Sequence, residues 1–308
     1  LHPIWKIHVT PTGRWSSSPN EQNWPSTRAR WNMRQMIVAP PGHIIVGADF
    51  KAQELRLYAV LARDETLLDA FRRKIEPHIL NAATLLAGSL GKPASEISNL
   101  YDYIKHRTDA CGSCSREGCL LCQEKEHWKN IAKRFVFLEA YEGQEEKLFS
   151  IMSADRRADG SRTFPGLKPS DVQTWHQVWH ATHPWMKQWQ NNVLRGWRQA
   201  GHVSTIIDGR RRFFLGGPDG PAMSNHGIQG GAASMQNRAI LKIAEAIPHR
   251  GWSDLSGLIL NVHDFAGVVV PIDRRREAEK ILSECMPYRH EDMDFPIDLK
   301  SGFSWSEV

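Results

Sequence analysis

The chain has few cysteines, no long apolar run, and no repeat or low-complexity segment. It contains 5 cysteines in 308 residues, which is unlike the disulfide framework of a secreted domain. No apolar stretch approaches the ~20 residues of a membrane helix. The N-terminus, LHPIWKIHVTPTGRW, has no hydrophobic region of a secretory signal. These absences favour a reducing compartment and no membrane partner.

The composition is that of a globular protein, with 41% hydrophobic and 24% charged residues. The length predicts one large domain or two ordinary ones, at roughly 150 residues per domain. A net charge of +5 suits a polyanionic partner without requiring one. Solvated surface charge is the alternative for the basic clusters at 28–34, 72–74, 210–212 and 274–276.

The sequence begins with a strand pattern, continues with a long helical region, and then returns mainly to strands. HIIVGADF (43–50) predicts a buried strand, and residues 73–200 are mainly helical, with a capping box at Ser170–Gln173. A hairpin follows at 202–214, then a helix after the glycine-rich segment at 227–231. LILNVHD and GVVVPI form a second hairpin, and FPIDL a last strand. This order predicts an α+β fold with a helical insertion.

Asp49 and Asp264 each end an aliphatic strand. If those strands are neighbours, both carboxylates lie at the same rim of the sheet. An ionised carboxylate there is costly unless it is paired or binds a metal, and Mg²⁺ prefers oxygen ligands. Either aspartate alone is more typical of a turn or strand end, so the metal hypothesis depends on their meeting.

A helical stripe occurs in KNIAKRFVFLEAY, where Lys129, Lys133, Phe137 and Tyr141 recur every four residues. Cations followed by rings suit a nucleoside triphosphate, because the cations meet phosphates and a ring packs on the base. The same spacing is typical of an ordinary amphipathic helix, which is the simpler interpretation of this segment alone.

Several segments together carry a family resemblance. In chain order they are TGRWSSSPNEQNWP, VGADFKAQELRLYAVLARDETLLDAF, KNIAKRFVFLEAYEG, GHVSTIIDGRRR, NHGIQGGAA, VHDF and FPIDLKSGFSWSEV. This series resembles the polymerase domain of family A DNA polymerases. The resemblance implies a right-hand polymerase palm, an antiparallel sheet with flanking helices, at 1–70 and 202–308. It also implies an inserted helical fingers subdomain at 71–201, and a bacterial or phage-infected cytoplasm.

The resemblance also implies residue roles. Asp49, Asp264 and the Phe50 carbonyl would bind two Mg²⁺ ions, and Lys133 would join both aspartates in catalysis. The residues implied for the dNTP are Phe50, Gln53, Glu54, His78, Lys129, Lys133, Phe137 and Tyr141. The residues implied for DNA are Arg14, Asn20, Gln22, Asn225, Gln229 and His263. A buried structural histidine is the alternative for His263, and a salt-bridged helix residue for Glu54.

The function that the resemblance implies is template-directed addition of dNTPs to a primer 3′-hydroxyl. Phe265 replaces the usual motif C glutamate, Glu142 follows the motif B tyrosine, and Pro221 replaces an arginine. These departures keep open a non-catalytic, zinc-bearing, nucleic-acid-binding relic of a polymerase. A related RNA polymerase is a further alternative, which Glu54 disfavours because the family glutamate blocks the 2′-hydroxyl.

The start of the chain bears on the thumb. In this family the thumb and any proofreading exonuclease precede the TGR segment, whereas this chain begins shortly before it, with Leu rather than Met. We therefore expect a missing upstream region, an absent thumb, and a thumb-bearing or processivity partner beside primer–template DNA.

A cysteine cluster is not predicted by the family motifs. Cys111, Cys114, Cys119 and Cys122 have C-x₂-C-x₄-C-x₂-C spacing, which fits a tetrahedral structural Zn²⁺ site on the fingers at 111–122. An iron–sulfur cluster and unbound thiols are the alternatives.

Overall fold

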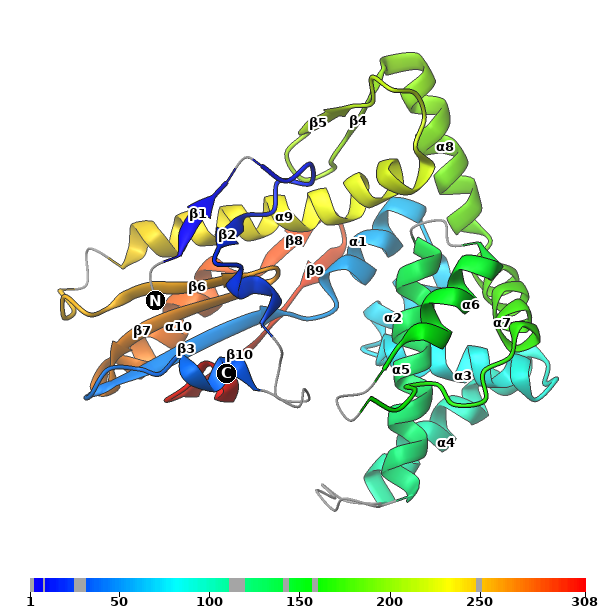
Figure 1. Ribbon diagram of the computed structural model, residues 1–308, viewed down its shortest axis with the longest axis horizontal. Helices are drawn as coiled ribbons and strands as arrows, with labels where there is room; N and C mark the ends of the chain where they lie inside the picture. Colours follow the sequence, from blue (N-terminus) through cyan, green and yellow to red (C-terminus); the bar gives the residue numbers. More distant parts are fainter. Residues whose placement is uncertain are drawn as a thin grey trace. The chain divides into compact units, whose positions relative to one another are not determined.

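The computed structural model describes residues 3–7, 9–24, 32–110, 120–140, 144–156, 160–247 and 251–308. The chain divides into two compact units (Figure 1). Unit 1 comprises Leu1–Leu57, His202–Phe214 and Asn225–Val308, and unit 2 comprises Tyr58–Gly201 and Leu215–Ser224. Sequence order and fold class agree with the expectation, since unit 2 is inserted between two parts of a sheet-containing unit. The names palm and fingers, with their boundaries at 70/71 and 201/202, stay predictions.

Unit 1 is built on a four-stranded antiparallel sheet of order β10-β3-β7-β6. The strands are β3 (His43–Phe50), β6 (Gly257–Val262), β7 (Phe265–Pro271) and β10 (Ile297–Gly302). β3 and β7 are almost fully buried along their aliphatic runs. In β3 only Asp49 is exposed, so the strand pattern places this carboxylate at the rim.

Helices pack against this sheet. α10 (Arg275–Cys285) contacts β3, β7 and β10. α9 (Gly220–Ala246) is fastened to the β6–β7 hairpin through Gln236, whose amide donates to the Asn261 side chain and the Phe265 carbonyl, both at 3.0 Å. Figure 1 shows α9 as the long yellow helix of this unit. The fold is thus the α+β arrangement that the sequence predicts.

Short elements complete unit 1. Two hairpins are β4 (His202–Ser204) with β5 (Arg211–Phe213), as predicted, and β8 (Tyr288–His290) with β9 (Met293–Phe295). Near the N-terminus, β1 (Ile4–Lys6) pairs with β2 (Ser16–Ser18). The 3-10 turns are η1 (Glu21–Asn23), η2 (Met33–Met36), η5 (Ile272–Arg274) and η6 (Trp305–Glu307).

Unit 2 is helical over its described residues, apart from an isolated bridge between Arg156 and Arg162. Its elements are α1 (Gln53–Ala62, which begins in unit 1), α2 (Glu65–Arg72), α3 (Pro77–Ser89), η3 (Ala94–Glu96), α4 (Ile97–Ala110), α5 (Leu120–Ala140), α6 (Glu145–Ala154), α7 (Pro169–Thr182) and α8 (Trp185–Ala200). α3 packs against α4, α5 and α7. Phe135 meets Trp175 and Trp179 edge-on, with ring centroids 6.2 Å apart in each pair.

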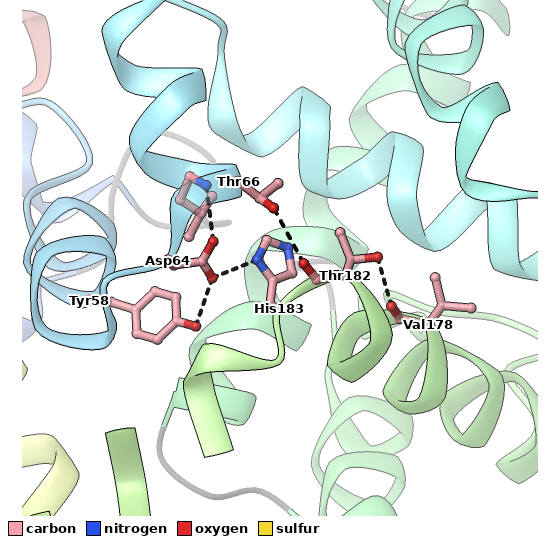
Figure 2. Close-up of polar contacts among 7 residues, drawn as sticks. Tyr58, Asp64, Thr66, Val178, Thr182 and His183 are labelled. Atoms are coloured by element: carbon pink, nitrogen blue, oxygen red, sulfur yellow. Dashed lines mark hydrogen bonds and ion pairs between the residues drawn. The ribbon is translucent and has the colours of Figure 1, made fainter. Parts of the chain in front are cut away.

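A buried polar network joins α1 and α2 to the end of α7 (Figure 2). Asp64 caps α2 by accepting from the Leu67 amide at 3.1 Å. Its other oxygen accepts from the Tyr58 hydroxyl at 3.1 Å and pairs with His183 Nδ1 at 2.7 Å. Burial and the Asp64 charge raise the pKa of Tyr58 well above its usual value. Three partners therefore compensate the buried Asp64 carboxylate.

Two helix starts differ from the prediction. α7 begins at Pro169 rather than after Ser170, because the Asp171 carboxylate accepts from the Lys168 amide at 2.8 Å and so fixes an earlier cap. α9 begins at Gly220, before the glycine-rich segment, where Asp219 accepts from the Ala222 amide at 3.0 Å. Gly230 and Gly231 lie inside the helix. A Cβ at Gly230 would come within 2.9 Å of Thr205, so close packing explains a glycine that composition suggests is a loop signal.

Candidate active site

The polar residues that interrupt the aliphatic β6–β7 hairpin form its turn. Val262 pairs with Phe265, which leaves His263 and Asp264 as a two-residue turn. His263 has a φ of 59°, a left-handed conformation that such tight hairpin turns require at their first position. His263 is exposed at this turn, and Asp264 is half-buried.

Asp49 lies beside this turn. It pairs with Phe265 across β3 and β7, and the Phe50 amide donates to the Asp264 carbonyl at 3.2 Å. Both aspartates line one pocket of about 360 Å³ in unit 1. The remaining lining residues are Arg34, Gly47, Val262, His263, Phe265, Asp298, Lys300, Trp305, Ser306 and Val308. The tertiary structure thus brings together the two carboxylates that the sequence singled out.

The electrostatics of the pair favour a cation. Burial, together with the nearby charge of Asp49, raises the pKa of Asp264 to about 7. Glu54 raises it further, whereas the Arg14 guanidinium opposes the shift. Two carboxylates that repel each other offer the oxygen donors that hard divalent cations bind. The two carboxylates are therefore oxygen donors of the kind that Mg²⁺ binds. Phe50 is not among the residues that line the pocket, so its carbonyl as a ligand stays a prediction.

Arg14 and Glu54 form an ion pair close to the turn, with side-chain exposures of 21% and 15%. Both charges influence Asp264 and His263. Burial lowers the pKa of His263, and Arg14 lowers it further. The salt-bridged alternative for Glu54 therefore describes its state in this structure, and Arg14, expected at DNA, is its partner.

Phe265 gives the pocket an aromatic wall where the family pattern has a carboxylate. Its ring packs with Leu260, Val262 and Trp305. A Cβ on Gly47 would lie 2.5 Å from the ring, so β3 needs glycine at this position. This side chain offers no oxygen to a cation. No local sequence signal indicates that Gly47 makes room for its ring.

Arg34 is a site residue that sequence reasoning missed. Its guanidinium lies 4.6 Å from the Trp305 ring centroid and donates to the Trp24 carbonyl at 3.4 Å. Burial lowers the pKa of Arg34, while the Asp49 charge opposes that shift. In the sequence Arg34 is one member of a basic cluster, and no local signal separates it from its neighbours.

The residues expected at DNA have different surroundings. The Gln22 amide donates to the Asn261 carbonyl at 3.1 Å in a buried contact, so it supports β6. Asn20 is exposed. Asn225 and Gln229 are half-buried, one turn apart on α9, and the Asn225 side-chain oxygen has no hydrogen-bond partner.

A cationic cluster occurs within unit 2. Lys129, Lys133 and Phe137 all lie on α5, and His78 is in the first turn of α3. Burial lowers the pKa of His78, and the charges of Lys133 and Lys129 lower it further, whereas the Glu76 charge opposes the shift. The buried His78 Nδ1 has no hydrogen-bond partner. The structure thus gathers the cations of the predicted triphosphate stripe near an imidazole that lies elsewhere in the sequence.

Some predicted residues lie outside the described part of the structure. They are Tyr141, the cysteines Cys111, Cys114 and Cys119, and the side chain of Cys122. Among the described residues, no helix is long and apolar enough to cross a membrane.

Comparison with known proteins decides the family. The model of DNA polymerase family A matches residues 1–101 and 123–307. The chain belongs to DNA polymerase family A. The matched ranges leave out 102–122, which contains the cysteine cluster, in keeping with its absence from the family motifs.

The chain is similar to parts of longer proteins. It is 27% identical to the thermostable DNA polymerase I of Thermus filiformis, over 100% of this chain and 32% of the relative. It is 26% identical to the chloroplastic/mitochondrial DNA polymerase I B of Arabidopsis thaliana, over 96% and 28%. The fold resembles the POL domain of Pol1 from M. smegmatis, in complex with DNA primer–template and dNTP, with a TM-score of 0.74, 22% identity, and coverage of 100% and 48%. The chain therefore spans about a third or less of these two curated relatives.

Proposed function

We propose that this chain is the palm and fingers of a template-directed DNA polymerase that adds dNTPs to a primer 3′-hydroxyl. The observation that carries the proposal is the meeting of Asp49 and Asp264 in one pocket at the sheet rim, with the pKa of Asp264 raised to about 7. Family membership adds to it. Residues 1–70 and 202–308 would form the palm, and residues 71–201 the fingers.

The two aspartates and the Phe50 carbonyl would hold two Mg²⁺ ions. When bound, these ions would neutralise charge on the reacting phosphate and lower the pKa of the attacking hydroxyl. Arg14 already partly offsets the negative potential at Asp264. His263, at the exposed turn, would lie near the primer-terminal phosphate.

The α5 cluster would bind the dNTP. Lys133 and Lys129 would pair with its phosphates, and Phe137 would pack on the nucleotide. His78 lies within reach of the lysine charges, which supports a role at the same phosphates. Tyr141 would lie by the templating base.

Sugar and duplex recognition involve residues that are partly engaged in this structure. Glu54, with Gln53 beside it, would exclude the sugar 2′-hydroxyl, and Arg14 would have to release Glu54 in order to contact DNA. The other residues proposed at DNA are Asn20, Gln22, Asn225 and Gln229. Amide donors can monitor the minor-groove acceptors that every base pair carries.

Primer extension tests the activity. The protein should extend a primer in the presence of dNTPs and Mg²⁺. It should strongly prefer dNTPs over rNTPs, and Glu54→Ala should weaken that preference. A wild-type preference for rNTPs would instead support the RNA polymerase alternative.

The relic is the second candidate, and the observation that favours it is the aromatic wall of Phe265 in the proposed metal pocket. Binding of primer–template without any incorporation would support the relic and overturn the polymerase. A thumb-bearing or processivity partner and a bacterial or phage-infected cytoplasm remain predictions.

A further inference from the structure

Within unit 2, three potential metal ligands from α5 and α7 converge. Glu139 is next to the last residue of α5, and its side chain is 2% exposed. His176 Nδ1 lies 2.5 Å from one Glu139 oxygen, and His180 Nε2 lies 3.2 Å from the other. One ligand atom from each residue lies within 4.8 Å of the other two.

The helix geometry of α7 directs both imidazoles to one place. His176 and His180 are four residues apart in HQVWH, so they lie on the same helix face. Their ring centroids are 4.3 Å apart, with an interplanar angle of 68°. The same spacing of paired histidines recurs in zinc-binding helices, where a further ligand comes from another segment.

The donor set selects a class of ion. Imidazole nitrogen with one carboxylate suits Zn²⁺ and neighbouring first-row transition metals, whereas Mg²⁺ favours sites made of oxygen donors. The histidine side chains are 26% and 27% exposed, so an ion could enter from solvent. A carboxylate buried as deeply as Glu139 needs positive charge or proton donors beside it, and either an ion or two N–H groups meet that need.

We propose that Glu139, His176 and His180 bind one Zn²⁺-class ion, with a fourth position open to solvent. The site uses nitrogen and oxygen donors and is separate from the Cys111–Cys122 cluster. It ties the C-terminal end of α5 to α7, and Gln190 supports the same end by donating to the Glu139 carbonyl at 3.4 Å. If α5 binds the dNTP as proposed above, the ion would brace that helix just before Tyr141.

Metal stoichiometry of the full chain is the first test. After chelation and reloading with Zn²⁺, the double variant His176→Asn/His180→Asn should bind one equivalent less than wild type, or at least about tenfold more weakly. His290→Asn, on β8 in unit 1, is the matched control and should bind like wild type. Equal stoichiometry and affinity in the double variant and wild type would overturn the site.

Cobalt(II) spectroscopy gives a positive test. His180→Cys should add a thiolate-to-cobalt charge-transfer band beyond any band from the native cysteines, because the new thiol would replace an imidazole ligand. His290→Cys should add none. If the two cysteine variants give the same spectrum, residue 180 does not ligate the ion.

Co²⁺ binding by the wild-type protein tests the site without relying on variants that could misfold. Alkylating the cysteines blocks thiolate ligation, so one equivalent of Co²⁺ with tetrahedral or five-coordinate visible bands and no thiolate band should remain, besides any six-coordinate Co²⁺ at the proposed Mg²⁺ site. Loss of all binding after alkylation would overturn the proposal. Because these readouts measure metal rather than nucleotide incorporation, their failure would leave the polymerase proposal standing.

Discussion

Carboxylates near the sheet rim of unit 1 and carboxylates inside unit 2 are stabilised in opposite ways. Asp49 and Asp264 face each other's charge, and the pKa of Asp264 rises to about 7. Asp64 and Glu139 in unit 2 are almost completely buried, yet each has histidine at hydrogen-bonding distance. The Asp49 charge disfavours the ionised form of Asp264, so a cation would relieve this repulsion, whereas histidines already lie beside the carboxylates of Asp64 and Glu139. A like charge beside a carboxylate therefore indicates a candidate reactive site more strongly than burial alone does.

The largest expected effect is on catalysis. Asp264→Asn should lower primer extension by at least about a thousandfold, or about 4 kcal/mol of transition-state stabilisation, because it removes a proposed metal ligand. Asp294→Asn, an exposed carboxylate of unit 1 paired with Arg289, should extend primers like wild type.

The thermal stability of Asp264→Asn tests whether Asp49 and Asp264 repel each other. Removing one of two repelling charges should raise the melting temperature of metal-free Asp264→Asn above that of wild type at pH 8. A lower melting temperature would mean that the acidic pair is compensated within the protein, and the contrast with unit 2 would fail.

In unit 2 the corresponding substitution, Asp64→Asn, should lower the stability of the protein. Asp64→Asn turns an amide donor toward the Tyr58 hydroxyl and His183, which now donate to one carboxylate oxygen (Figure 2). Leaving such groups unpaired in a buried network should cost about 2–4 kcal/mol of unfolding free energy. Urea denaturation measures this loss of unfolding free energy. An unchanged midpoint would show that the network contributes little to stability.

The contact between the Phe265 ring and Gly47 should make the effects of substitutions at these two positions on the free energy of unfolding non-additive. Gly47→Ala should cost about 1–3 kcal/mol, because its Cβ would overlap the ring. In a Phe265→Ala background the same change should cost much less. Gly257→Ala is the control, since nothing lies within 4 Å of its Cβ. Additive costs in the double variant would contradict the contact.

The smallest expected effect concerns pH. Burial lowers the pKa of His226, and the charges of Arg210 and Arg212 lower it further, whereas its hydrogen bond to the Arg210 carbonyl and the Asp208 charge oppose the shift. The unfolded chain therefore takes up this proton first. The contribution of His226 to stability is complete above its unfolded pKa of about 6.5 and is lost as the pH falls toward the lowered folded value. Denaturation midpoints between pH 7 and pH 5 should fall less in His226→Gln than in wild type, and parallel profiles would contradict this assignment.

Local pattern determined much of the fold. The aliphatic runs of β3, β6 and β7, the helical block and the two predicted hairpins follow from periodicity and turn residues, because these signals depend on near neighbours. Helix starts were less accurate. Asp171 and Asp219 act as caps through backbone contacts that composition does not distinguish from alternatives nearby. Gly230 lies inside α9, where the nearness of Thr205 leaves no room for a Cβ.

By itself the sequence indicated which residues carry the proposed chemistry, because its motifs resemble those of family A DNA polymerases. The strand ends at Asp49 and Asp264 and the helical stripe of α5 alone left simpler interpretations open. Only the tertiary structure decided which other side chains lie beside these residues. It paired Arg14 with Glu54, placed Arg34 on Trp305 inside the pocket, and brought Glu139 to His176 and His180. These contacts join segments far apart in the chain, where burial and charge depend on packing that no local window of sequence contains.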